Sequence, residues 1–135
     1  MKAKVSWVEN MELNGVTDNG KIVMMDTGKN AIAASPAQLV LQALAGCTMM
    51  DIVLILTKSR KKIEKFWVDA EAEEAETYPK IFTKIHLTYN ITAKEITPAE
   101  AERAIQLSEK TYCRVHAMLE GKVNITSSLK LNEIK

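Results

Sequence analysis

Residues 35–60, with the sequence SPAQLVLQALAGCTMMDIVLILTKSR, constrain the fold more than any other part of this chain. Most of this segment consists of aliphatic, methionine, alanine and glycine residues. Between Leu39 and Leu56 the apolar run is interrupted at only four positions, which are Gln42, Cys47, Thr48 and Asp51. A run of this length and composition predicts one long helix without a polar face.

Both ends of this helix carry recognisable signals. Ser35 can cap the first turn, and Pro36 suits the first helical position, where no backbone N–H is needed. Gln38 stands three places after Ser35 and can complete a capping box. Lys58 and the cations at 60–62 favour a helix C-terminus. We therefore expect a central helix over residues 35–62.

A helix that is apolar on every side must be buried on every side or lie in a membrane. The run is close to the length of about 20 residues that a membrane span requires. Gln42 and Asp51 would then lie in the hydrocarbon, where a central carboxylate costs roughly 2.5–3.5 kcal/mol. We favour a buried central helix, and we expect a second subunit to help to cover it, because one small domain can hardly surround it.

Chain length and net charge limit the number of domains and the kinds of partner. The chain has 135 residues, so we expect a single domain over 1–135, and its net charge of +1 gives no footprint for nucleic acid or an anionic membrane. The first residues, MKAKVSWVEN, lack the apolar core of a signal peptide. We therefore expect a cytoplasmic protein without nucleic-acid or membrane partners.

The segments before and after the central helix carry strand signals, and the second of them also carries helix signals. Residues 1–34 predict a β-meander with strands at 2–8, 11–16 and 21–25, the last two joined by a turn at Asn19-Gly20. Residues 65–135 predict a hairpin of strands 66–73 and 81–91, an amphipathic helix from Thr97-Pro98, a helical turn at 113–119 and a final strand or strand pair over 122–131. The order of elements is typical of the α+β class. The inner stripe of the amphipathic helix is expected to comprise Ala101, Ala104, Ile105, Ser108 and Tyr112.

The two cysteines, Cys47 and Cys113, are the residues most relevant to function. In a cytosolic protein such a pair is either catalytic or redox-sensing, or it consists of two inert buried thiols. His116 lies three places after Cys113, so Cys47, Cys113 and His116 could supply three metal ligands. Paired CxxC spacing and an obvious fourth ligand are missing, as are glycine-rich phosphate loops and the GxSxG and HExxH motifs. We therefore expect neither a metal nor a cofactor.

Three stretches resemble the OsmC-like family, which includes the organic hydroperoxide resistance proteins. SPAQLVLQALAGCTMMDI is similar to the central helix of that family, in which Ser/Asn-Pro opens a hydrophobic helix with a cysteine near its middle. TYCRVHAMLEGKVNIT resembles the segment where a second cysteine begins a later turn, and YPKIFTKIHLTY resembles the strand before the second helix. The cysteines lie 66 positions apart (113 − 47 = 66), and the resemblance covers essentially the whole chain.

This resemblance implies an α+β fold and an intertwined homodimer, in which antiparallel sheets from both subunits wrap around two long buried helices. It also implies a thiol peroxidase that takes part in oxidative stress defence. The Cys47 thiolate would attack the peroxide O–O bond, release an alcohol and become a sulfenic acid, and Cys113 would condense with it as a disulfide. An external dithiol or lipoyl-type reductant would restore both thiols. Apolar neighbours such as Leu44, Met49 and Met50 would suit an organic hydroperoxide.

The chain departs from the family where the thiolate is usually activated. Active members usually carry a Glu just after the proline and an Arg in the N-terminal strands, whereas this chain has Ala37 and Gln38 after its proline and no Arg before Arg60. Gln38, Arg60 and Arg114 are the candidate supporting residues, with Lys21 as a further cation. Asp51, one turn after Cys47, would oppose thiolate formation.

When the disulfide is reduced, the Cys113 thiolate is expected to be stabilised as a leaving group by the backbone N–H groups of the turn that this residue begins. Two further functions stay open on the same fold. One is a dimeric module that binds an apolar small molecule without catalysis. The other is a redox sensor that acts through Cys47 and Cys113 without turnover.

Overall fold

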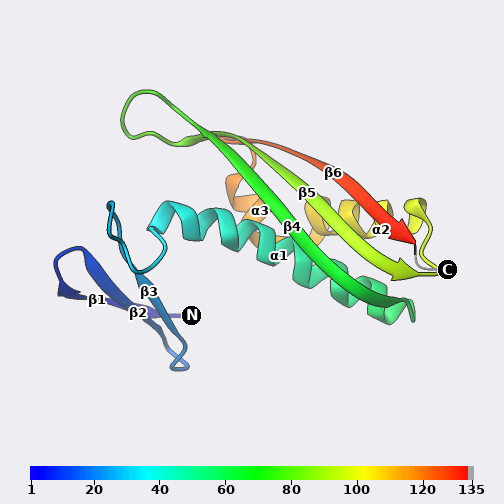
Figure 1. Ribbon diagram of the computed structural model, residues 1–135, viewed down its shortest axis with the longest axis horizontal. Coiled ribbons are helices and arrows are strands. Elements are labelled where there is room, and N and C mark those ends of the chain that lie inside the picture. Colours follow the sequence, from blue (N-terminus) through cyan, green and yellow to red (C-terminus); the bar gives the residue numbers. More distant parts are fainter. Residues whose placement is uncertain (134–135) are drawn as a thin grey trace. The chain divides into compact units, whose positions relative to one another are not determined.

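The computed structural model describes residues 1–133 and shows an α+β fold with two sheets and a long helix (Figure 1). This is the fold class that the strand and helix signals predict. The chain forms two compact units, residues 1–40 and 41–135. The grouping of both units into a single domain stays a prediction.

The first unit contains an antiparallel sheet in the order β1-β2-β3, as the meander signals predict. Its strands are β1 (Ala3–Glu9), β2 (Glu12–Thr17) and β3 (Ile22–Met25). Gly20 has a positive φ of 83° in the turn between β2 and β3, which explains why this turn needs a glycine. Large apolar side chains of this sheet are exposed, among them Trp7 at 71% and Ile22 at 65%.

Helix α1 (Pro36–Lys58) begins at the predicted residue and ends earlier than predicted. The Ser35–Gln38 capping box is present, because each residue's backbone N–H donates to the other's side-chain oxygen at 2.9 and 3.2 Å. At the other end Arg60 has a φ of +59°, and the backbone N–H groups of Arg60 and Lys61 donate to the carbonyls of Thr57 and Leu56. This Schellman-type ending terminates the helix, so the predicted extension to 62 is wrong.

Helix α1 is buried along one stripe and not on every side. The stripe has a spacing of four residues and consists of Leu44, Thr48, Ile52 and Leu56. Val40, Met50, Val53 and Leu54 are exposed by 40–76%. By length and composition alone the helix could cross a membrane, since it has 23 residues and is strongly apolar. The core helix of a soluble protein can have the same length and composition, and the buried stripe packs into the hydrophobic core with β5.

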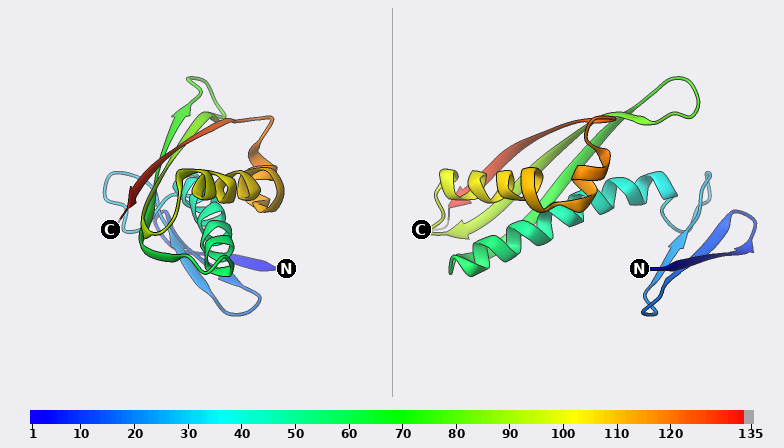
Figure 2. Two further views of the ribbon diagram at one scale, coloured as in Figure 1. Left: turned by 90° about the vertical axis from the view of Figure 1, so that its right-hand side faces the viewer. Right: turned by 180° about the vertical axis from the view of Figure 1, so that it is seen from behind.

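The second unit contains a sheet in the order β4-β5-β6 with the helices on one face (Figure 2). Strands β4 (Lys62–Glu74) and β5 (Phe82–Lys94) form the predicted antiparallel hairpin. Strand β6 (Asn124–Glu133) pairs parallel to β5, where we expected antiparallel sheets. The reason is the helical connection, which carries the chain from the end of β5 back to its start.

That connection consists of α2 (Pro98–Leu107), a π-helical turn η1 (Ser108–Tyr112) and α3 (Arg114–Leu119). The capping box predicted at Thr97 is present with Glu100. Alternate residues of β5 are fully buried beneath these helices and form the centre of the core, namely Ile85, Leu87, Tyr89 and Ile91.

Candidate functional site

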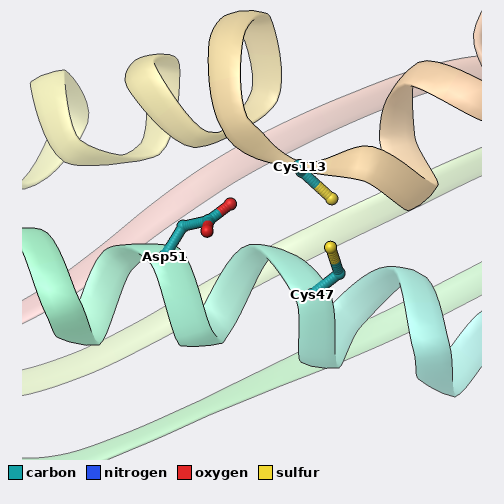
Figure 3. A group of neighbouring side chains, drawn as sticks. All are labelled: Cys47, Asp51 and Cys113. Carbon is teal, nitrogen blue, oxygen red and sulfur yellow. The ribbon is translucent and has the colours of Figure 1, made fainter.

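The side chains of Cys47, Asp51 and Cys113 converge between α1 and the junction of η1 with α3 (Figure 3). The two sulfur atoms and a carboxylate oxygen of Asp51 all lie within 4.8 Å of one another. Both cysteines are free thiols. The structure therefore brings together the sulfurs of Cys47 and Cys113, as the redox-pair hypothesis requires, and places the Asp51 carboxylate beside them.

Helix α1 presents two of these groups because Cys47 and Asp51 are four residues apart and share a helix face. Between them Thr48 is fully buried, and its hydroxyl donates to the carbonyls of Ala45 (2.9 Å) and Leu44 (3.3 Å) within the helix. Cys47 and Asp51 are themselves half-buried. The pair therefore lies at the border of the core, on a rigid element.

The π-helical turn η1 positions the third group. The backbone N–H of Cys113 donates to the carbonyl of Ser108, five residues earlier, at 2.7 Å. The π-turn thus contains one residue more than an α-turn. This extra residue rotates the side chains that follow it about the helix axis. Tyr112 is consequently 60% exposed, so its predicted place on the inner stripe is wrong. Cys113, the next residue, is 3% exposed.

The Asp51 carboxylate is held by a hydrogen bond from the next element. The hydroxyl of Ser108, which is fully buried, donates to Asp51 Oδ2 at 2.8 Å. The neighbouring Glu109 accepts a hydrogen bond at 2.9 Å from the hydroxyl of Tyr89, whose pKa is raised mainly by burial. Sequence reasoning placed Ser108 on the inner stripe but found no role for it, because nothing in the local pattern announces a π-turn.

Burial raises the pKa of the Cys113 thiol to about 12. The hydrogen bond to Cys47 and the negative charges of Cys47 and Asp51 act in the same direction. The expected stabilisation of the thiolate by the new turn exists, since the backbone N–H of His116 donates to Cys113 Sγ at 3.3 Å. Burial outweighs this hydrogen bond in the pKa of the reduced thiol, while the role of Cys113 as a leaving group in disulfide reduction stays a prediction.

A testable consequence concerns alkylation of the reduced protein by iodoacetamide. Only the thiolate reacts, so Cys113 with a pKa of about 12 should react slowly at pH 8, and its rate should rise about tenfold per pH unit until the pH approaches that value. Peptide mapping by mass spectrometry after timed quenching measures both cysteines. In denatured protein the two rates should become equal. A Cys113 rate that levels off near pH 9 in the folded protein would contradict the raised pKa.

The candidate supporting residues lie elsewhere. Gln38 is occupied in the capping box, about two and a half turns before Cys47 along α1. Arg60 and Arg114 have exposed side chains, the first in the turn that ends α1 and the second on the outside of α3. Lys21 is also exposed.

His116 does not complete a metal triad with the two cysteines. Its ring Nδ1 lies 3.5 Å from Glu120 Oε2, and the group that joins the cysteines is Asp51. The sequence signal that could have identified Asp51 is its i+4 spacing from Cys47. We had interpreted that spacing only as an electrostatic disadvantage.

A cleft of about 650 Å³ opens beside the cluster between the second half of α1 and α2. Asp51 lines it together with the apolar side chains of Leu54, Ile55 and Leu107. Lys58 and Arg103 supply charge. Of the neighbours that we expected around the thiol, Leu44 is instead fully buried in the core, Met49 is half-buried and Met50 is 76% exposed.

Comparisons with known proteins extend these observations. The family model described as OsmC-like protein matches residues 27–128. Protein YhfA of Escherichia coli (strain K12) is 37% identical over 131 residues, which cover 97% of this chain and 98% of YhfA. The crystal structure of an OsmC-like protein from Mycoplasma pneumoniae has a TM-score of 0.84 at 17% identity, covering 97% of this chain and 96% of that one. An organic hydroperoxide resistance protein from Legionella pneumophila has a TM-score of 0.68 at 18% identity, covering 96% and 95%.

Proposed function

Because this chain belongs to the OsmC-like protein family, we propose that it is a thiol-dependent peroxidase that reduces organic hydroperoxides in the cytoplasm. Cys47 and Cys113 would form its redox pair. The observation that carries the proposal is the approach of two free thiols to within 4.8 Å in the core of this fold. The name of the Legionella pneumophila relative, an organic hydroperoxide resistance protein, is consistent with it.

The reaction would proceed in three balanced steps. Cys47 Sγ attacks the O–O bond of ROOH, ROH leaves, and Cys47 becomes a sulfenic acid. Cys113 Sγ attacks the sulfenic sulfur, and water leaves as the disulfide forms. An external dithiol or lipoyl-type reductant then returns two electrons and two protons and restores both thiols. Cys47 takes the first role because it is half-buried, whereas Cys113 is buried with a raised pKa.

The cleft lined by Asp51, one helical turn after Cys47, supports a preference for organic hydroperoxides. Its apolar lining of Leu54, Ile55 and Leu107 offers an organic group a surface away from water, which hydrogen peroxide cannot use. With a dithiol supplied, we expect cumene or tert-butyl hydroperoxide to be consumed with turnover and at least about tenfold faster than hydrogen peroxide, since burial of a few methyl groups is worth more than 1.4 kcal/mol. Peroxide consumption measured under matched concentrations tests this. Equal rates would remove the argument from the cleft.

We also propose that the protein is a homodimer, because α1 leaves Val40, Met50, Val53 and Leu54 exposed in the single chain. The expected result is a particle of about twice the 15.1 kDa chain mass in light scattering at micromolar concentration. A stable, folded species with the mass of one chain under these conditions would contradict the proposal.

The binding module and the redox sensor are the alternatives to the peroxidase. The cleft of about 650 Å³ is large enough for a small organic ligand, which favours the binding module as the second candidate. Thiol titration before and after one equivalent of organic hydroperoxide separates the classes. Rapid loss of two thiols supports the redox functions, and turnover with a dithiol then separates the peroxidase from the sensor. Unchanged thiols favour the binding module.

A further inference from the structure

We propose that Cys47, Asp51 and Cys113 of the reduced protein bind one thiophilic divalent cation of the Zn²⁺ class. Two sulfurs and one carboxylate oxygen form a donor set that zinc accepts, with a fourth position left for water. All three residues belong to the second compact unit of one chain. The site is therefore complete within a single subunit, and the proposal does not depend on peroxidase activity.

The distances suit such an ion. In a tetrahedral site with Zn–S bonds of about 2.3 Å, the two sulfurs lie roughly 3.8 Å apart, and each lies roughly 3.5 Å from the oxygen. The three donor atoms already lie within 4.8 Å of one another. The donor atoms therefore need to approach one another by at most about 1.3 Å, which is within the reach of side-chain torsions. Figure 3 shows the two sulfurs and the carboxylate facing the same space between the two elements.

Two of the donors are already oriented by hydrogen bonds. The Ser108 hydroxyl donates to Asp51 Oδ2 at 2.8 Å, which leaves Oδ1 available as a ligand atom. The backbone N–H of His116 donates to Cys113 Sγ at 3.3 Å, and sulfur can accept this bond and coordinate a metal at the same time. Outer partners of this kind fix the ligands of protein metal sites and raise their affinity.

Charge also favours a cation at this position. Metal binding would release the thiol protons, and the two thiolates and the carboxylate would then carry three negative charges at the border of the core, where charges are stable only when they are paired or coordinate a metal. Among residues 1–133 the contacts between basic and acidic side chains are Lys61–Glu100 and His116–Glu120, and neither involves the cluster. A divalent cation would supply the compensation that these side chains do not provide.

Metal binding and oxidation would then exclude each other. When an organic hydroperoxide oxidises both thiols, the S–S bond forms, ROH and water are released, and the metal loses two of its three protein ligands. A bound cation in turn withdraws electron density from both sulfurs and lowers their nucleophilicity toward the peroxide. The metal-bound form would therefore hold the reduced pair in a protected state.

The test uses Co²⁺ as a spectroscopic probe on the reduced full-length protein. We expect one equivalent per chain, a sulfur-to-cobalt charge-transfer band in the near ultraviolet, and displacement of cobalt by Zn²⁺. Asp51→Asn should weaken binding at least about tenfold while the sulfur bands remain. Glu102→Gln, which changes an exposed carboxylate of α2, should bind like the wild type.

Oxidised wild-type protein provides a second measurement that needs no variant. It should bind no cobalt at this site, and zinc-loaded reduced protein should lose its thiols to organic hydroperoxide at least tenfold more slowly than metal-free protein. Cobalt binding without a sulfur band, or equal binding by the Asp51→Asn variant, would overturn the proposal. Because the cobalt readout does not use turnover, an inactive peroxidase that still shows the sulfur band would refute only the proposed function.

Discussion

Replacing Cys47 by Ser is expected to abolish peroxide consumption altogether, whereas Cys113→Ser should consume one equivalent and then stop. The first variant lacks the sulfur that attacks the O–O bond. Cys113 cannot substitute for it, because that thiol is 3% exposed and burial, the main cause of its raised pKa, remains in the variant. The second variant retains the attacking sulfur but cannot close the disulfide, so a sulfenic acid should accumulate at Cys47.

The measurement combines single-turnover peroxide loss with trapping by a dimedone-type probe and peptide mass spectrometry. The wild type should show little trapped sulfenic acid, because the neighbouring sulfur condenses with it quickly. If Cys47→Ser still consumes one equivalent and Cys113→Ser consumes none, the two roles are reversed. If both variants turn over like the wild type, neither cysteine takes part in catalysis, and the binding module becomes the favoured function.

Replacing Ile52 by Ala is expected to cost about 2–5 kcal/mol of unfolding free energy, which is a large part of the roughly 5–15 kcal/mol typical of a domain. Ile52 is fully buried in the stripe of α1 that packs in the core with β5. Its truncation removes three buried carbon atoms and leaves a cavity that rigid neighbours fill only in part.

Denaturant unfolding at one fixed protein concentration measures this cost, because association would otherwise shift the midpoint. Thr57→Ala is the matched control. Thr57 lies on the same helix with an exposed side chain, so its replacement should change the free energy of unfolding by less than about 0.5 kcal/mol. Equal effects of the two substitutions would mean that the buried stripe does not anchor α1 to the sheet.

Much of the fold could be predicted from the sequence because its signals are local. The alternation along β1, β4 and β5, the Asn19-Gly20 turn and the capping boxes at Ser35 and Thr97 all depend on residues a few positions apart. The direction of β6 could not be predicted in this way. It depends on where the helices return the chain, and no pattern within residues 124–133 records that.

The two cysteines of the site could be predicted from the sequence, whereas the residues around them could not. Cys47 and Cys113 were identified because two segments of the chain resemble family motifs. Asp51 was noticed only as an unfavourable charge, and the contribution of Ser108 required the contact between η1 and α1 to be seen. Arg60, by contrast, was expected to assist the thiol because it is charged, yet its positive φ shows that it ends a helix.

The π-helical turn has a consequence for how the length of this segment can vary in evolution. Each residue rotates a helix by about 100°, so one residue gained or lost between Pro98 and Cys113 would turn the sulfur away from its partner. Substitutions on the exposed side of this segment leave the rotation unchanged. Insertions and deletions are therefore tolerable in the loop between β4 and β5 but not between Pro98 and Cys113, where the spacing is part of the chemistry.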